Sequence, residues 1–217
     1  MAIDLSGWVL INAALIPDPT RARRVSLGDR AGGILSPEVA DTGRAILRPM
    51  PVIKPGDFGD DRVKALLTRH LEGMHANSPP GHVFALDWSG LQEPEISFYT
   101  LWEGQDLLGF GALKELEPRA GEIKSMRTAD AHLRRGVAAT ILDHIIAEAR
   151  QRGYTRLSLE TGSGPAFEPA LKLYRKYGFT EGGAFGGYEK SPFNQFLHLD
   201  LVFDRRGTGA QSLSSTH

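Results

Sequence analysis

The sequence predicts an α/β domain in which a mixed sheet carries helices on its faces. Three segments with alternating apolar residues stand at 96–102, 107–116 and 121–128. Two amphipathic helical segments follow, with one strand between them and one after them. The order strands, helix, strand, helix, strand is typical of such a mixed sheet.

Composition limits the functions that this chain can have. It has 217 residues, which suits one domain with additional segments. Because the formal net charge is −1, and binders of nucleic acid or membrane surfaces usually carry a basic excess, we expect neither partner. The sequence contains no cysteine, which excludes disulfides, thiolate metal ligands and a cysteine nucleophile.

The two ends differ from the middle of the chain. Residues 1–47 show no sustained period of two or 3.6, so we expect an irregular N-terminal extension there and the domain at 48–203. The Gly-, Ser- and Thr-rich segment 204–217 is predicted to be a flexible tail. The apolar stretch 8–15 lacks the flanks of a secretory signal, and no run is long enough to span a membrane, so we expect a cytoplasmic protein.

The first half of the domain begins with a short apolar stretch at 51–53. A helix follows, with apolar residues at helical spacing from Val63 to Met74. His70 lies on its apolar stripe, so we expect a packed or partly exposed residue there rather than a ligand. Two prolines in the segment 77–81 end the helix. The first two of the three strands are joined by a turn at Glu103-Gly104, which predicts a hairpin.

The second half alternates helices with strands. A long helix is predicted from about 136 to 152. A strand at 157–160 and a helix that opens at Pro165 and stops at Gly178 come next. The last strand is predicted at 196–203.

The third strand has a face pattern that bears on the site. Strict alternation within 121–128 predicts that its even-numbered residues share one face and its odd-numbered residues the other. The first set is Glu122, Lys124, Met126 and Thr128; the second includes Ile123, Ser125 and Arg127.

The loop after this strand enters a helix at Gly136. The small residues Gly136 and Ala138 let an anionic group approach the free N–H groups and the positive dipole end of the helix. Arg134 and Arg135 add cationic donors beside them. Taken alone, a basic helix start with a glycine is at least as typical of a solvated helix terminus.

A second motif spans 170–179. Taken alone, it is typical of an amphipathic helix with core tyrosines. Both motifs in one chain, separated by one helix and one strand, resemble the GNAT superfamily of N-acetyltransferases. The pyrophosphate loop of that superfamily has the pattern Gln/Arg-x-x-Gly-x-Gly/Ala, and its later helix has the pattern Ala-x-x-Leu-Tyr-x-x-x-Gly-Phe. The second pattern matches in full at Ala170, Leu173, Tyr174, Gly178 and Phe179.

The first pattern matches at Gly136 and Ala138, with Leu133 where the family usually has Gln or Arg. Phe167 stands where many members carry Asn near the cofactor. The resemblance covers about 50–203. More narrowly, segments 122–128 and 157–162 are similar to a bacterial subgroup of which little is characterised, and some of its members are labelled as acting on indole-3-acetic acid.

The resemblance implies the GNAT fold, a mixed, mostly antiparallel twisted sheet of about six to seven strands flanked by helices. It implies an N-acetyltransferase that moves an acetyl group from acetyl-CoA, its co-substrate, to the amine of a small molecule resembling an amino acid or metabolite. A protein or peptide N-acetyltransferase and a non-catalytic acyl-CoA-binding sensor stay open as alternatives. A homodimer is compatible with the sequence. Seven scattered histidines without a short-spaced carboxylate pair predict no metal site.

The resemblance also implies roles for particular residues. Glu122 would be the general base and Tyr174 the general acid. Their alternative roles are a glutamate paired with Lys124 and a packed ring. The backbone N–H of Met126 would polarise the thioester carbonyl, and main-chain groups of Met126 and Thr128 would pair with the pantetheine arm. The residues expected to bind the cofactor are Met126, Arg127, Thr128, Arg134, Arg135, Gly136, Val137 and Ala138. Acceptor choice is expected near Met74, His75, Ser78 and Pro80 and in segment 185–193.

Overall fold

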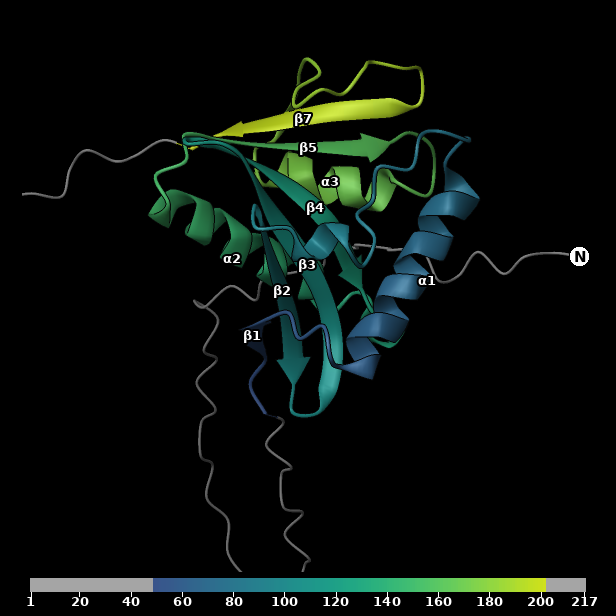
Figure 1. The fold of residues 1–217 in the computed structure, drawn as a ribbon, viewed down its shortest axis with the longest axis vertical. Helices are drawn as coiled ribbons and strands as arrows, with labels where there is room; N and C mark the ends of the chain where they lie inside the picture. The colour runs from purple at the N-terminus through teal and green to yellow at the C-terminus, as the bar shows by residue number, and fades with distance from the viewer. Residues whose placement is uncertain (1–48, 202–217) are drawn as a thin grey trace, which may run out of the picture.

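The computed structural model describes residues 49–201, which form one sheet with helices on both faces (Figure 1). Within this range seven strands have the order β1-β2-β3-β4-β5-β7-β6. They are β1 (Val52–Pro55), β2 (Ile96–Glu103), β3 (Asp106–Glu117), β4 (Ala120–Thr128), β5 (Arg156–Gly162), β6 (Thr180–Glu181) and β7 (Asn194–Asp200). Among these described strands, all neighbours are antiparallel except β4 and β5. The predicted mixed, mostly antiparallel sheet is thus confirmed.

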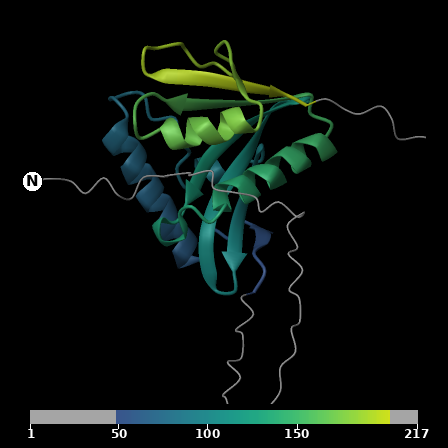
Figure 2. The same ribbon diagram turned by 180° about the vertical axis from the view of Figure 1, so that it is seen from behind.

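The sheet separates the core into two clusters, and helices cover each of them. The helices are α1 (Asp61–Asn77), α2 (Val137–Gln151) and α3 (Glu168–Lys176), with the short 3₁₀ turns η2 (Gly90–Gln92) and η3 (Asp130–His132). Figure 2 shows α2 and α3 against one face of the sheet. Their apolar stripes bury a cluster that includes Ile141, Leu171 and Leu197, whereas α1 buries Val63 against Phe110 on the opposite face.

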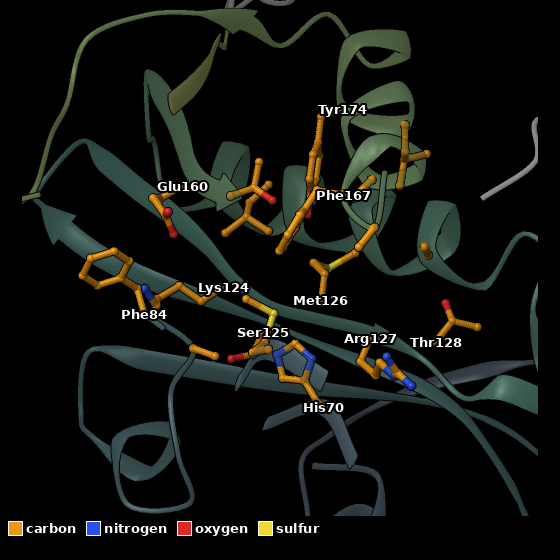
Figure 3. A pocket seen from close by; sticks show the side chains of 18 residues that line it. His70, Phe84, Lys124, Ser125, Met126, Arg127, Thr128, Glu160, Phe167 and Tyr174 are labelled. Atoms are coloured by element: carbon orange, nitrogen blue, oxygen red, sulfur yellow. The ribbon is translucent and has the colours of Figure 1, made fainter. Parts of the chain in front are cut away.

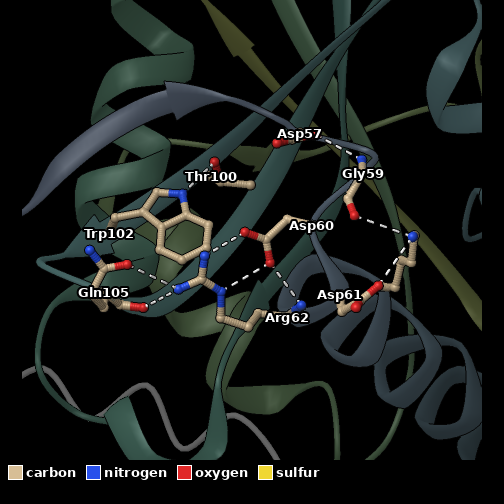
Figure 4. A network of polar contacts seen from close by, with 9 residues as sticks. Asp57, Gly59, Asp60, Asp61, Arg62, Thr100, Trp102 and Gln105 are labelled. Atoms are coloured by element: carbon tan, nitrogen blue, oxygen red, sulfur yellow. Dashed lines mark hydrogen bonds and ion pairs between the residues drawn. The ribbon is translucent and has the colours of Figure 1, made fainter.

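The start of α1 contacts the β2–β3 hairpin through polar and cation–π interactions (Figure 4). Asp60 caps the helix by accepting a hydrogen bond from the backbone N–H of Arg62 at 2.8 Å. The Arg62 guanidinium lies 4.4 Å from the centroid of the Trp102 ring and donates to the carbonyl oxygen of Gln105 at 2.7 Å. These contacts fix where the following turns of α1 lie over the sheet.

Strands β4 and β5 pair only at their beginnings. Their register runs from Ala120 opposite Arg156 to Glu122 opposite Ser158. Beyond that point no further pairing joins these two described strands, while β4 stays paired with β3 and β5 with β7. The sheet therefore opens into a gap between β4 and β5.

A β-bulge in β4 overturns the predicted face pattern. Gly111 of β3 stands opposite two residues of β4, Ser125 and Met126, and Ser125 has a φ of 51°. The extra residue shifts the alternation, so Met126 packs toward α2 while Glu122 and Lys124 face the α1 side. The expectation that Met126 and Thr128 share a face with Glu122 was wrong, because alternation holds only in an unbroken ladder.

Other boundaries moved by a few residues. Helix α3 begins at Glu168 and carries Pro169 in its first turn, so Pro165, the expected start, lies in the preceding turn. Strand β7 begins at Asn194, two residues before the expected start. The short strand β6 was not predicted. None of the described helices is both long and apolar enough to cross a membrane. The expected extension 1–47 and tail 204–217 lie outside the described residues.

Candidate active site

A cavity of about 120 Å³ occupies the gap between β4 and β5 (Figure 3). Residues from α1, β4, the start of α2, β5 and α3 line it, so it connects the two faces of the sheet. We call its two sides the α3 wall and the polar wall. The α3 wall consists of Ala166, Phe167, Ala170, Leu173 and Tyr174. The polar wall, on the α1 side, consists of His70, Lys124, Ser125, Arg127 and Glu160.

Tyr174 is the polar residue of the α3 wall. Its ring packs against Phe179, with 5.6 Å between ring centroids, and 6% of the residue is exposed. Burial raises the pKa of Tyr174 well above its usual value of about 10. The phenol therefore stays protonated at neutral pH, which is the state that a general acid needs. Its packing role and a catalytic role are compatible.

Glu122 lies beside the cavity but is not among the residues that line it. Its Oε1 accepts a hydrogen bond from the Tyr188 hydroxyl at 2.6 Å. The same oxygen forms an ion pair with Lys124 Nζ at 3.1 Å. Lys124 Nζ also donates to the Tyr188 hydroxyl at 2.5 Å. Only 2% of Glu122 is exposed. This closed triangle corresponds to the paired-glutamate alternative for Glu122.

Glu160 is a carboxyl group that the sequence reasoning missed. It lies on β5, lines the cavity, and points to the α1 side of the sheet because Leu159 packs in the core on the other face. Burial raises the pKa of the Glu160 carboxyl to about 7; nearby Glu122 adds to the rise and Lys124 opposes it. A carboxyl with a pKa near neutrality can accept a proton in a general-base step. The sequence signal that could have identified it is a glutamate at the end of the predicted strand 157–160.

The start of α2 forms a second part of the site. Gly136 is the N-cap with a φ of 79°, a conformation that glycine adopts without strain. The first intrahelical bond runs from the Thr140 N–H to the Gly136 carbonyl at 2.9 Å. The N–H groups of Val137, Ala138 and Ala139 therefore have no partner within the helix, and they face the end where the dipole favours an anion.

The predicted cofactor residues divide into three groups. Met126, Arg127, Thr128 and Ala138 line the cavity, while Gly136 and Val137 belong to the adjoining helix start. The third group is the two arginines, of which Arg134 is exposed beside that start. Arg135 is occupied by an ion pair with Glu103 at 2.7 Å. The small side chains of Ala138, Ala166 and Ala170 leave room for a narrow chain, so the site fits a phosphate-bearing ligand with a thin arm.

The segments expected to govern the acceptor are only partly at the cavity. Met74 lines it, whereas His75, Ser78 and Pro80 do not. From segment 185–193, Tyr188 packs on Phe84, a cavity residue, with 5.1 Å between ring centroids. Within residues 49–201 no group of three or more His, Cys, Asp or Glu is arranged to hold a metal ion.

A mixed sheet that opens around a cavity, with the N-terminus of a helix at one end, has the geometry to hold a phosphate-bearing ligand. Residues 63–179 match the acetyltransferase (GNAT) family. The chain belongs to this family and is an acyltransferase.

Similar proteins support this assignment. The uncharacterized N-acetyltransferase YsnE of Bacillus subtilis is 51% identical over 149 residues, which cover 69% of this chain and 99% of that protein. The uncharacterized N-acetyltransferase YedL of Escherichia coli is 45% identical over 152 residues, which cover 70% of this chain and 96% of that protein. The IAA acetyltransferase of Azospirillum brasilense is 34% identical over 54% of this chain and 75% of that protein.

Among solved structures, a Bacillus subtilis acetyltransferase in complex with CoA has a similar fold. Its TM-score is 0.53 and its sequence identity 20%, and the match covers 70% of this chain and all of that one. At this identity the likeness concerns the fold alone.

Proposed function

We propose that this acyltransferase moves an acetyl group from acetyl-CoA to the amine of a small molecule. The observation that carries the proposal is the cavity in the β4–β5 gap, which has a buried phenol on one wall and a carboxyl of raised pKa on the other. Amine acetylation is assisted by a base that takes the amine proton and by an acid that protonates the departing thiolate. The two groups come from α3 and β5 and meet the same cavity.

The co-substrate would be held by the start of α2 and by β4. The N–H groups of Val137 to Ala139 offer donors to phosphate oxygens, and Arg134 adds a positive charge beside them. Met126 lies in the β4 bulge, where the ladder is interrupted, so its backbone N–H is a candidate to polarise the acyl carbonyl. The CoA complex of the similar Bacillus subtilis structure agrees with a CoA-type ligand.

For the chemical step we assign the base to Glu160 and the acid to Tyr174. The Glu160 carboxylate takes a proton from the amine, whose nitrogen attacks the thioester carbonyl. The carbon–sulfur bond breaks, and the departing thiolate takes the Tyr174 proton. Glu122 was the base expected from the sequence; its ion pair with Lys124 instead favours a role in holding that cation beside Glu160.

A small acceptor is favoured over a protein by the similarity to the IAA acetyltransferase. Purified protein should be incubated with acetyl-CoA and a panel of amines, amino acids and peptides, and free thiol release followed. Release with small amines alone supports the proposal. Release only with peptides indicates a protein acetyltransferase, and binding of CoA without release indicates a sensor.

The domain limits 48–203 and a cytoplasmic location are further parts of this proposal. Limited proteolysis of the full chain checks the first and should leave a core that begins near residue 48. Cell fractionation checks the second.

A further inference from the structure

Among the described residues, three buried polar atoms on the polar wall have no hydrogen-bond partner. They are His70 Nε2, Ser125 Oγ and Arg127 Nε. The three residues are 7%, 9% and 6% exposed, and all three line the cavity. Figure 3 shows them on the side of the cavity away from Tyr174 and Phe167. Buried polar atoms nearly always have partners, so three orphans beside one cavity indicate a missing ligand group.

The donor chemistry of the three atoms restricts that group. Arg127 Nε can only donate, the Ser125 hydroxyl can donate, and His70 Nε2 donates when it carries the ring proton. Burial and nearby Arg127 lower the pKa of His70 to about 4, so the ring is neutral at neutral pH. A ligand group with several acceptor lone pairs and no need to donate satisfies all three. A carboxylate is such a group.

The local charges point the same way. The Arg127 guanidinium pairs with Asp130 at 2.9 Å, but Arg69 pairs with the same carboxylate at 2.7 Å. One carboxylate therefore serves two guanidinium groups, so Arg127 shares its counter-ion with Arg69. Lys124 has a carboxylate partner of its own in Glu122. A ligand carboxylate beside Arg127 would give this guanidinium a partner that it does not share.

We propose that His70, Ser125 and Arg127 form a subsite for the carboxylate of the acceptor, so that the acceptor is an amino acid or another amine that carries a carboxylate. This inference rests on the proposed function, in which Glu160 receives the amine proton. Glu160 and Arg127 stand on different strands of the same wall, on β5 and β4. An acceptor with both groups can place its amine at the first and its carboxylate at the second.

The test compares matched acceptors that differ only in the carboxylate. Amino acids with increasing separation of amine and carboxylate, from glycine to 5-aminovalerate, and the common L-amino acids are assayed beside their primary amides. We expect wild type to prefer at least one acid over its amide by about 10- to 100-fold in kcat/KM, the usual effect of hydrogen bonds to a charged group. In Arg127→Gln the preference should fall to within a few-fold. The KM for acetyl-CoA should stay unchanged, because the subsite assigns the Arg127 side chain to the acceptor in place of the cofactor-binding role predicted from the sequence.

Two further variants serve as a control and as a substitute for Arg127→Gln. Arg156→Gln removes an exposed arginine that pairs with Asp200 and does not line the cavity, so this variant should keep the preference. If Arg127→Gln does not fold, Ser125→Gly serves instead, because glycine adopts the φ of 51° readily and the change removes the hydroxyl together with its one β-carbon. It should reduce the preference by roughly 3- to 10-fold. Equal use of acids and amides by wild type, or a raised KM for acetyl-CoA as the sole effect of Arg127→Gln, overturns the subsite.

A binding measurement separates this inference from the proposed function. CoA-saturated protein is melted with N-acetyl amino acids and with their methylamides. Protection by the acids alone, lost in Arg127→Gln, supports the subsite even if no acceptor is ever acetylated, in which case only the proposed function fails. No protection by any acid, together with no acid preference in turnover, refutes the subsite.

Discussion

The two walls of the cavity differ in whether their polar groups have partners within the protein. The α3 wall is made of small apolar residues and of two rings that each pack on an aromatic residue behind the wall, and its one polar group is a phenol. The polar wall holds an ion pair, a carboxyl of raised pKa and three atoms without partners. The difference indicates a division of labour. The α3 wall is complete without a ligand, whereas the polar wall needs one.

The largest expected effect tests where the base lies. Glu160→Gln should lower kcat/KM for the acceptor by about 10³-fold at neutral pH, within the usual range for general-base catalysis. In wild type, kcat/KM should rise with pH through about 7, the pKa of Glu160, and this limb should disappear in the variant. Because alkali deprotonates the amine without help, the loss should shrink as pH rises. Steady-state kinetics across pH provides the measurement.

Glu122→Gln is the comparison for that experiment. It breaks the ion pair with Lys124 and should lower stability. The limb should remain but move to lower pH, because Glu122 no longer raises the pKa of Glu160 while Lys124 still lowers it. If the limb persists in Glu160→Gln and is absent from Glu122→Gln, the base lies on β4 and the paired triangle must open during turnover.

The second prediction concerns the anion site at the start of α2. Gly136→Asp should weaken CoA binding by more than about 10²-fold, because a carboxylate then occupies the place of a phosphate. Gly136→Asn, of similar size and without the charge, should weaken it less. Gly153→Asp is the matched control: Gly153 lies at the other end of α2 with a φ of 78° and equally open surroundings. CoA affinity by calorimetry should be unchanged in the control, and an equal loss in both would point to general destabilisation.

The third prediction concerns the phenol on the α3 wall. Tyr174→Phe keeps the ring and its packing, so unfolding should change little while kcat falls by roughly 10²-fold. Tyr177→Phe removes a hydroxyl one turn further along, which donates to the Ala139 carbonyl at 3.3 Å outside the cavity. That control should retain wild-type turnover. Full activity of folded Tyr174→Phe would remove the tyrosine from the mechanism.

The smallest expected effect is on stability. The pKa of Glu160 is raised on folding from about 4.5 to about 7, so the folded protein binds more protons than the unfolded chain between these values. The Glu160 contribution to stability is therefore present below about pH 4.5 and is lost as pH rises through 7. Glu160→Gln should be more stable than wild type at pH 8, on the order of 1–2 kcal/mol after solvent screening, with the difference shrinking at pH 5. Thermal unfolding at both pH values measures this, and an equal difference at both would contradict it.

Sequence periodicity alone was sufficient for most of the architecture. The hairpin at Glu103-Gly104, the end of α1 before the prolines and the apolar stripe of α2 are local patterns, and the structure confirms them. The motif containing Tyr174 was equally evident, because a helix brings residues three and four apart onto one face. The family assignment followed from these local patterns and is confirmed.

Only the tertiary structure decided what the cavity contains. The bulge at Ser125 depends on Gly111 of the neighbouring strand, so no pattern within β4 could show that Met126 faces away from Glu122. Glu160 and His70 are 90 positions apart in the numbering and meet the same cavity only because β5 leaves β4 and α1 crosses the sheet. Burial and partners set the chemistry of each group, and both depend on contacts between distant segments.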